Sequence, residues 1–304
     1  MGEFERDFYD DRRRRWRRSG FWRGLLVALL IVVIVSLSGI LERIREAQRH
    51  VARVDISGVI TEDIELESML RQIGERDNVE ALILRVNSPG GTTAGSEALY
   101  AVVRDIADVK PVVAVLGETA ASGGYVAALS ADHIVSRGNT LTGSIGVIME
   151  YPDVSDVLER WGIDVETFRS SPLKAEPAPY REISPEGREL TEALITESFA
   201  WFRDLVGERR GLAGAELDRV ANGAVFTGRI ALEAGLVDTL GGEREARDWL
   251  ESQEEGLGDL PVRTWEVERD EPFLTRLLFS FIPSGGILGE IAQRTGPKLY
   301  SIAP

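Results

Sequence analysis

The body of the chain alternates between apolar runs and amphipathic segments. Valine, isoleucine, leucine and alanine dominate residues 51–60, 79–86 and 111–116, whereas residues 62–73 and 93–106 carry apolar side chains every three or four positions. Strands buried on both faces are almost continuously apolar, and helices that cover a sheet are apolar on one face. The pattern therefore predicts an α/β fold whose core is a parallel sheet with flanking helices.

Shorter elements extend this predicted domain to residue 251. Further strands are expected at 133–136, 144–149 and 164–168, and further helices at 122–130, 154–161, 184–210 and 243–251. Because no internal repeat is present, we predict a single domain over residues 51–251. Residues 252–304 form a tail whose apolar part, 273–292, begins with a run too short to span a bilayer. We expect this tail to pack on the body or on a neighbouring subunit, with contact at the membrane surface as the alternative.

The N-terminal region has the pattern of a membrane anchor. Residues 24–41 (GLLVALLIVVIVSLSGIL) form an uncharged segment of 18 residues, near the lower limit for a spanning helix. Seven arginines lie within residues 12–23, whereas residues 42–50 are nearly balanced in charge. This bias predicts a single-pass anchor in the cytoplasmic membrane, with residues 1–23 in the cytoplasm and the body, after a juxtamembrane stretch, on the outer, periplasmic side. A cleaved signal peptide, with a weak cleavage pattern at Ser36-Leu37-Ser38, is the alternative.

Charge and composition exclude several function classes. The net charge is −15, made of +4 in residues 1–50 and −19 in the remainder, and an acidic body is a poor partner for nucleic acid phosphates. The chain has no cysteine, so it has neither disulfides nor thiolate metal sites. Its two histidines, His50 and His133, are far apart in sequence and match no metal-binding motif. We therefore expect no metal and no cofactor.

Lysine is rare in this chain. Of 35 basic residues only Lys110, Lys174 and Lys298 are lysine. Arginine keeps its proton at ordinary pH, whereas a desolvated lysine can lose it and act as a base. Lys174 lies downstream of the glycine-flanked Ser122, and the poor supply of histidine makes a Ser–His–Asp triad improbable. This pairing indicates a serine nucleophile with a lysine base, and we interpret Lys110 and Lys298 as ordinary surface charges.

Three glycine-bearing turns follow predicted strands. In Asn87-Ser88-Pro89-Gly90-Gly91 the paired glycines expose backbone N–H groups suited to a developing oxyanion, or they form a plain tight turn. In Ala121-Ser122-Gly123-Gly124 the Gly123 N–H is a second candidate donor, and the alternative makes Ser122 a simple helix N-cap. In Leu141-Thr142-Gly143-Ser144 the serine is a candidate to orient the base, and a structural β-turn is the alternative.

Four motifs in order, NSPGG, ETAASGGY, LTGSIGV and SSPLKAEPAPY, resemble the signal peptide peptidase A (SppA) family of membrane-anchored Ser–Lys proteases, peptidase family S49. The resemblance covers roughly residues 51–250, and residues 226–238 resemble the closing helix and turn of the Clp protease/crotonase fold. It implies a serine endopeptidase that degrades remnant signal peptides and other apolar peptides at the membrane.

The same resemblance implies a role for each matched residue. Ser122 matches the nucleophile, Lys174 the general base and Ser144 the residue that orients the base. Gly91 and Gly123 match the oxyanion donors, with Gly90 as the alternative to Gly91. Before the lysine this chain has Ser-Pro-Leu where many relatives have Gly-x-Tyr, which implies a different pocket and cleavage preference.

The length of the chain adds an expectation about assembly. With one catalytic-type domain it resembles the short form of the family, which builds complete sites by forming homo-oligomers. Two other classes of function remain open. A crotonase-type acyl-CoA enzyme shares the fold and the paired oxyanion donors, and a non-catalytic membrane scaffold would need neither the serine nor the lysine.

Overall fold

The computed structural model describes residues 48–267. The chain divides into two units, Met1–Trp265 and Glu266–Pro304, and every described helix and strand belongs to the first. The expected anchor at 24–41 and the apolar part of the tail at 273–292 lie outside the described residues. Within residues 48–267, no helix has both the length and the apolar character needed to cross a bilayer.

Strands and helices alternate through the first half of the domain and shorten after it. In chain order they are β1 (His50–Ile60), α2 (Ile64–Glu75), β2 (Val79–Gly91), α3 (Thr93–Ala107), β3 (Val112–Ala121), α4 (Gly123–Leu129), β4 (His133–Ser136), β5 (Leu141–Gly143), α5 (Ser155–Arg160), α6 (Pro185–Arg210), α7 (Gly214–Val220), β6 (Val225–Thr227), α8 (Gly228–Glu233), β7 (Thr239–Leu240), α9 (Glu243–Gln253) and β8 (Val262–Trp265).

The described strands form one sheet around a parallel centre. Its path is β6-β5-β3-β2-β1-β8, and β1, β2 and β3 run parallel, as the apolar runs predict. Strand β8, which lies in the predicted tail and was not predicted, also pairs in parallel with β1. The central strand β3 changes partner along its length, because its start pairs with β4 and its end pairs with β5. Parallel strands present their carboxyl ends at one edge, so the loops after β2, β3 and β5 meet there.

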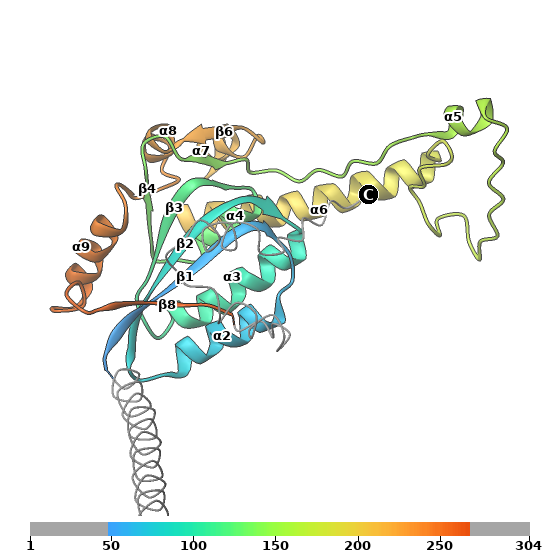
Figure 1. The fold of residues 1–304 in the computed structure, drawn as a ribbon. Helices are drawn as coiled ribbons and strands as arrows, with labels where there is room; N and C mark the ends of the chain where they lie inside the picture. The colour runs from blue at the N-terminus through green and yellow to red at the C-terminus, as the bar shows by residue number, and fades with distance from the viewer. Residues whose placement is uncertain (1–47, 268–304) are drawn as a thin grey trace, which may run out of the picture. The chain divides into compact units, whose positions relative to one another are not determined.

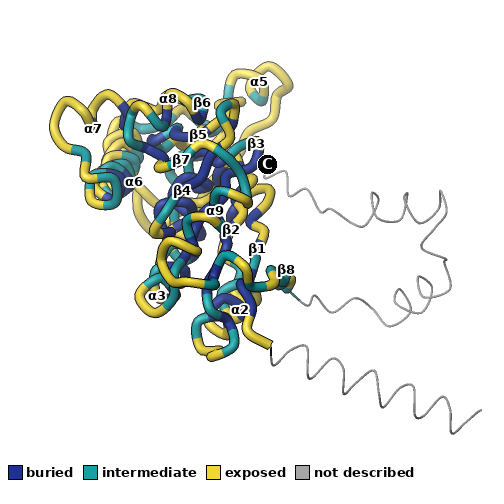
Figure 2. The backbone as a smooth tube through the Cα atoms, turned by 90° about the vertical axis from the view of Figure 1, so that its left-hand side faces the viewer, coloured by how far each residue is buried: buried dark blue, intermediate teal, exposed yellow. Residues whose placement is uncertain are grey.

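Helices cover both faces of this sheet (Figure 1). Helices α2, α3 and α4 pack on one face, and α9 packs against β3 and β4 on the other. Burial is deepest in the central strands (Figure 2), where Leu82, Ile83 and Leu84 are fully buried in succession. Each such side chain contributes about 1.5–3 kcal/mol relative to an exposed one. The core thus holds the carboxyl ends of β2 and β3 rigidly.

Two predicted strands are absent. Residues 144–149 and 164–168 have no strand structure, and the chain pairs instead through the shorter β5. Ser144 adopts a positive φ of 51°, which turns the backbone out of the ladder directly after Gly143. Farther on, Val165 and Phe168 are exposed, so their apolar character does not mark a buried strand.

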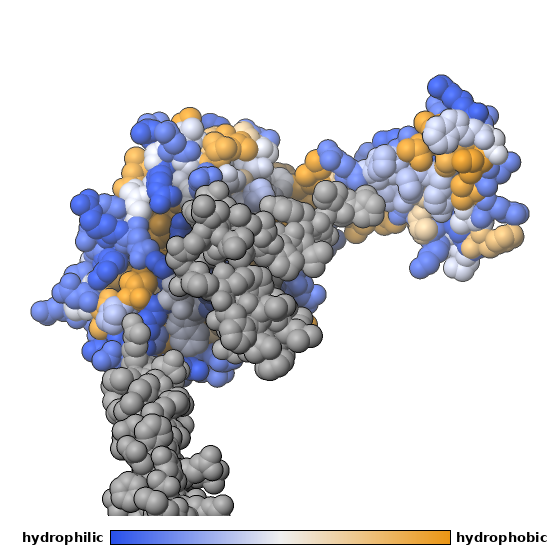
Figure 3. All heavy atoms as spheres, viewed as in Figure 1, coloured by the Kyte–Doolittle hydropathy of each residue, from blue (hydrophilic) through white to orange (hydrophobic). Residues whose placement is uncertain are grey.

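Residues 147–184, called the arm below, extend away from the sheet together with the first turns of α6 (Figure 1). The arm contains the short helix α5 and several large exposed apolar side chains, which gather around α5 in Figure 3. They are Ile148, Met149, Val154, Val157, Trp161, Ile163, Val165, Phe168 and Leu173. Such a cluster is unusual on the surface of an isolated soluble domain.

Helix α6 connects the arm to the sheet domain. It begins at a Ser184 cap, whose Oγ accepts from the Gly187 N–H at 3.0 Å, and it ends at Gly211 with a φ of 66°. Only its last turns are anchored, where Phe202, Leu205 and Val206 are buried. The predicted helix 184–210 is therefore confirmed, and its C-terminal part alone belongs to the core.

Candidate active site

Ser122 occupies a strained turn between β3 and α4. Its φ of 52° and ψ of −121° lie where residues other than glycine are rarely found. The backbone is held there because the Ser122 N–H donates to the Gly143 carbonyl at 2.8 Å. The half-buried side chain makes no capping hydrogen bond to α4, so the simple N-cap interpretation is wrong. A strained strand-to-helix turn is how other hydrolases expose a serine nucleophile.

The two candidate oxyanion donors lie against this turn. The Gly91 nitrogen lies 3.1 Å from the position that a Cβ on Gly123 would take, so the two backbones approach closely beside Ser122. A side chain on Gly91 would overlap the Ile60 carbonyl, which explains why this position needs glycine. An oxyanion hole needs two backbone N–H donors close together beside the nucleophile, and this close approach of the two backbones is compatible with one.

Gly90 is the weaker of the two alternatives for the first donor. Its N–H donates to the Ser88 Oγ at 3.1 Å within the same turn, and this bond engages the donor. A Cβ on Gly90 would lie 3.0 Å from the Ser122 Cβ, and its φ is 126°. Glycine at this position therefore allows close packing against the serine, and the geometry favours Gly91 over Gly90 as the donor.

Ser144 directly follows β5, the strand that pairs with the end of β3. Each serine directly follows one member of the Ala121–Gly143 pair that ends the β3–β5 ladder. Ser144 is half-buried, and its N–H donates to the Ala224 carbonyl at 2.7 Å. Three described residues other than glycine have positive φ, namely Ser122, Ser144 and Ala175, and the third is adjacent to Lys174. Backbone strain therefore clusters at the predicted site residues, as it does at functional sites in general.

Lys174 is exposed on the arm, outside this cluster. Its backbone N–H donates to the Ser171 carbonyl at 3.2 Å, but within the described part of the chain no hydrogen bond or ion pair joins its Nζ to Ser122 or Ser144. The single chain thus brings together Ser122, Ser144 and the two glycines without the lysine. A general base that is ready to act lies within hydrogen-bond reach of the serine, so Lys174 is not positioned to act on Ser122 of its own chain.

Lys110 is not an ordinary surface charge. Its Nζ donates to the carbonyls of Ile73 and Arg76, at 2.8 and 2.6 Å, and so satisfies the C-terminal end of α2. Burial lowers the pKa of Lys110. The residue nevertheless precedes β3 whereas Ser122 follows it, and at about 3.3 Å per residue the strand separates the two by about 30 Å. Lys110 is therefore no rival for the role of base.

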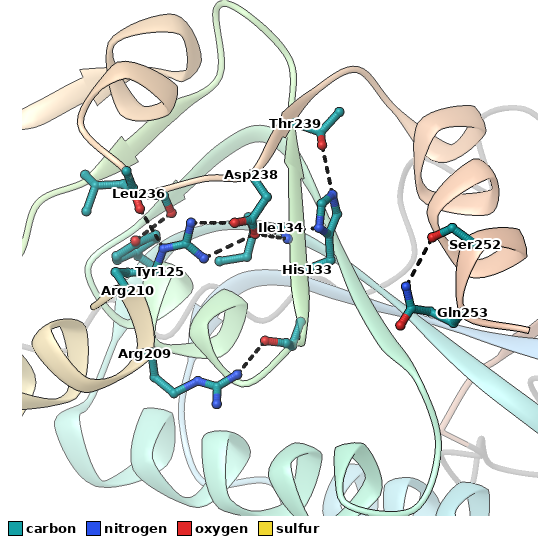
Figure 4. Close-up of polar contacts among 12 residues, drawn as sticks. Tyr125, His133, Ile134, Arg209, Arg210, Leu236, Asp238, Thr239, Ser252 and Gln253 are labelled. Atoms are coloured by element: carbon teal, nitrogen blue, oxygen red, sulfur yellow. Dashed lines mark hydrogen bonds and ion pairs between the residues drawn. The ribbon is translucent and has the colours of Figure 1, made fainter. Parts of the chain in front are cut away.

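Both histidines are also remote from Ser122. His50 begins β1 and His133 begins β4, at the edge opposite the carboxyl ends of the strands. His133 pairs in register with Val113, stacks on Trp249 and contacts Thr239 Oγ1 through Nε2 at 2.9 Å (Figure 4). Burial lowers its pKa. This placement excludes a histidine-based triad at Ser122 within one chain. Residues 48–267 also contain no cluster of three potential metal-ligating side chains.

A buried polar network supports the Ser122 turn from behind. The Tyr125 hydroxyl on α4 donates to the Leu236 carbonyl at 2.7 Å, and Arg210 at the end of α6 binds Asp238 at 2.7 Å (Figure 4). Asp238 also accepts from the Ile134 N–H. Burial alone would raise the pKa of Asp238, but the Arg210 hydrogen bonds outweigh it and lower that pKa. The network joins α4, α6 and the segment before β7.

Sequence reasoning missed two further groups. Ser96 on α3 is buried, its Oγ has no hydrogen-bond partner among the described residues, and it lies directly against Gly123. On the arm, Glu176 is almost fully buried between Arg169 and Arg181. The sequence did offer a signal for Glu176, because it is the only acid between Arg169 and Arg181 and lies two residues after the rare lysine. Nothing local in the sequence distinguishes Ser96 from an exposed helical serine.

Sequence comparisons relate the chain to known peptidases. A family model described as peptidase family S49 matches residues 104–257, which include Ser122, Ser144 and Lys174. The putative protease slr0021 of Synechocystis is 34% identical over 232 residues, covering 76% of this chain and 83% of that protein. The putative signal peptide peptidase SppA of Enterococcus faecium is 28% identical over 291 residues, covering 82% and 83%. The chloroplastic serine protease SPPA of Arabidopsis thaliana is 35% identical over 187 residues, which are 61% of this chain but only 27% of that protein.

Two solved structures superpose in part on this chain. A membrane-bound stomatin-specific protease, 1510-N, superposes with a TM-score of 0.47 at 19% identity, covering 72% of this chain and 99% of that one. ClpP1 of Listeria monocytogenes superposes with a TM-score of 0.43 at 16% identity, covering 64% and 92%.

Proposed function

Because the chain belongs to peptidase family S49, we propose that it is a serine endopeptidase in which Ser122 is the nucleophile and Lys174 the general base. The observation that carries the proposal is the Ser122 turn. A strained backbone presents a hydroxyl that caps no helix, and the backbones of Gly91 and Gly123 converge beside it. This combination serves acyl transfer, and the alternative of a plain structural turn does not require it.

The chemistry follows from this arrangement. Ser122 Oγ attacks the scissile carbonyl while Lys174 Nζ accepts its proton and then transfers it to the leaving amine. The N–H groups of Gly91 and Gly123 stabilise the oxyanion, and water then resolves the acyl-enzyme in a second step of the same kind. Ser144, at the end of the neighbouring strand, orients the lysine through a hydrogen bond.

A second copy of the chain supplies Lys174 in this proposal. The lysine lies on an arm that leaves its own domain, and the arm carries apolar side chains such as Trp161 and Phe168 that are 76% and 88% exposed. Covering this apolar surface in a homo-oligomer would stabilise the assembly and desolvate the lysine. Desolvation disfavours the charged ammonium, so a lysine buried on assembly can act as a base, and burial of apolar surface can offset the cost.

The substrates we propose are apolar peptides at the membrane, above all signal peptides that remain after secretion. Support comes from the uncharged segment 24–41 with its preceding arginines, and from the relatives named signal peptide peptidase and serine protease SPPA. The arginine bias places the catalytic domain on the periplasmic side of the cytoplasmic membrane.

The decisive experiment assays the full chain in detergent or vesicles on a fluorogenic apolar peptide. Ser122→Ala, Lys174→Ala and Lys174→Arg should each abolish cleavage, the last because arginine keeps its proton. A fluorophosphonate probe should label Ser122 in the wild type, which an acyl-CoA enzyme of the crotonase type would not allow. Cleavage retained by Ser122→Ala or Lys174→Ala would refute the assignment.

Mixing the variants tests whether the lysine comes from a neighbour. In a co-assembled 1:1 mixture of Ser122→Ala and Lys174→Ala chains, roughly a quarter of the interfaces join an intact serine to an intact lysine. We therefore expect about a quarter of wild-type activity from the mixture and none from either variant alone. A mixture as inactive as its components would refute a site shared between copies.

A further inference from the structure

Two arginines on the arm enclose the turn that carries Lys174. Arg169 Nη1 donates to the carbonyl two residues before the lysine at 2.6 Å, and Arg181 Nη2 donates to the carbonyl one residue after it at 3.0 Å. Both guanidinium groups also bind one oxygen of Glu176, Oε1, at 3.3 and 2.9 Å. A single carboxylate therefore ties together the two groups that hold the backbone on either side of the lysine.

Glu176 is the most buried charge on the arm. Its side chain is 2% exposed, although most of the surrounding segment, including Lys174, is exposed. The hydrogen bond from Arg181 lowers the pKa of Glu176, so the carboxylate is ionised at neutral pH. A buried acid among exposed residues costs desolvation energy that only its paired arginines offset. A buried ion-pair cluster does not make an exposed segment more soluble, so we expect Glu176 and its two arginines to have another function.

The carboxylate also packs against the first turn of α6. Its second oxygen, Oε2, lies 2.8 Å from the position that a Cβ on Gly187 would take, in the first turn of the helix, and it has no hydrogen-bond partner among the described residues. Helix α6 then runs back to the core, where Arg210 binds Asp238 behind the Ser122 turn. One continuous helix thus joins the Lys174 turn to the domain that holds the nucleophile.

We propose that Glu176, held by Arg169 and Arg181, is a positioning residue that fixes the Lys174 turn before assembly, so that the lysine reaches Ser122 of a neighbouring copy in one defined geometry. The inference rests on the proposed function. A lysine side chain loses considerable rotamer freedom when it is held in place, and a flexible turn would add backbone entropy to that cost. Ala175, held at a φ of 62°, shows that the turn adopts a conformation that its neighbours must maintain.

The test compares Glu176→Gln with a matched control, Glu182→Gln, an exposed acid of the same segment. The full chain is assembled and assayed on the fluorogenic apolar peptide, with its oligomer mass measured. Because the substitution keeps the shape of the side chain and removes its charge, we expect kcat to fall about ten-fold or more with KM nearly unchanged. The control should behave like the wild type.

A second readout separates positioning from general destabilisation. The chain has three lysines, so competitive acetylation across pH, resolved by mass spectrometry, reports the pKa of Lys174 with Lys110 as an internal reference. In the assembled Glu176→Gln variant we expect the pKa of Lys174 to move toward its ordinary value, while that of Lys110 stays as in the wild type. If Glu176→Gln does not assemble, Arg181→Lys decides, because it keeps the charge and loses the forked hydrogen bonds.

The outcomes distinguish the two proposals. The positioning role would be overturned if an assembled Glu176→Gln or Arg181→Lys variant kept the wild-type kcat and Lys174 pKa while Ser122→Ala and Lys174→Ala remained inactive. Activity retained by Lys174→Ala would instead overturn the proposed function itself.

Discussion

The hydrogen bond from Tyr125, on the helix that follows the Ser122 turn, gives a sharp stability prediction. Tyr125 on α4 is fully buried, and its hydroxyl donates to the equally buried Leu236 carbonyl at 2.7 Å. The substitution Tyr125→Phe removes one oxygen atom, keeps the ring packing and leaves that carbonyl without this donor. Leaving a buried acceptor unsatisfied costs about 1–3 kcal/mol. For a described domain of this size, each kcal/mol lowers the melting temperature by about 2–4 °C.

We therefore expect the Tyr125→Phe variant to melt about 2–12 °C below the wild type. In urea the midpoint should fall with the m-value unchanged, because the surface exposed on unfolding is the same. Burial raises the pKa of Tyr125, so the hydroxyl remains a donor at alkaline pH and the difference should persist at about pH 9.

The matched control is Tyr100→Phe on α3. Tyr100 is only half-buried, and its hydroxyl makes no hydrogen bond within the described residues. Removing that hydroxyl should change the unfolding free energy by less than about 0.5 kcal/mol. Equal melting temperatures for Tyr125→Phe and the wild type, or an equal loss in both variants, would refute the reasoning.

Three further predictions concern the packing and the charges around the site. Gly123→Ala places a methyl group against the Ser96 hydroxyl, so it should lower the melting temperature, and adding Ser96→Ala should restore part of the loss; no restoration would contradict the contact. The lowered pKa of Asp238 means that its pairing with Arg210 stabilises the fold fully above the unfolded pKa of about 3.9 and is lost as pH falls through the lower folded pKa. Urea unfolding from about pH 5 to pH 3 should therefore show a steeper loss for the wild type than for Asp238→Asn. Lys110→Met removes the group that satisfies the end of α2 and should cost about 1 kcal/mol while leaving kcat unchanged; a large loss of kcat would contradict the remote position of Lys110.

Much of the candidate site was predictable because it depends on strand ends. The runs at 79–86 and 111–116 lie in buried parallel strands, and parallel strands bring the turns that follow them to one edge. Gly91 and Ser122 follow these runs, and they lie at the ends of adjacent strands in the structure. Ser144 was assigned through its motif and was expected to begin a strand, whereas it directly follows β5. The choice between Gly90 and Gly91 needed atomic contacts, since both are glycines of one turn.

The failures share one physical cause. Residues 144–149 and 164–168 are rich in apolar side chains, but a strand also needs a neighbour to pair with, and local pattern carries no information about neighbours. The interpretation of Lys110 as an ordinary surface charge was wrong for a similar reason. Its sequence position before a strand gives no sign that its ammonium group reaches the carbonyls at the end of α2, which is a contact between segments distant in the chain.

By itself the sequence determined the α/β architecture and the family motifs, and it named the hydroxyl, the amine and the glycine N–H groups of the candidate site. It could do so because the burial of apolar runs and the chemistry of serine, lysine and glycine are local properties. Only the tertiary structure decided where those groups lie. It gathers Ser122, Ser144, Gly91 and Gly123 at one edge, and it places Lys174 on the exposed arm, two residues from the Glu176 ion pairs. The reason is that distances between segments depend on strand pairing, turn conformation and buried ion pairs, which no single stretch of sequence contains.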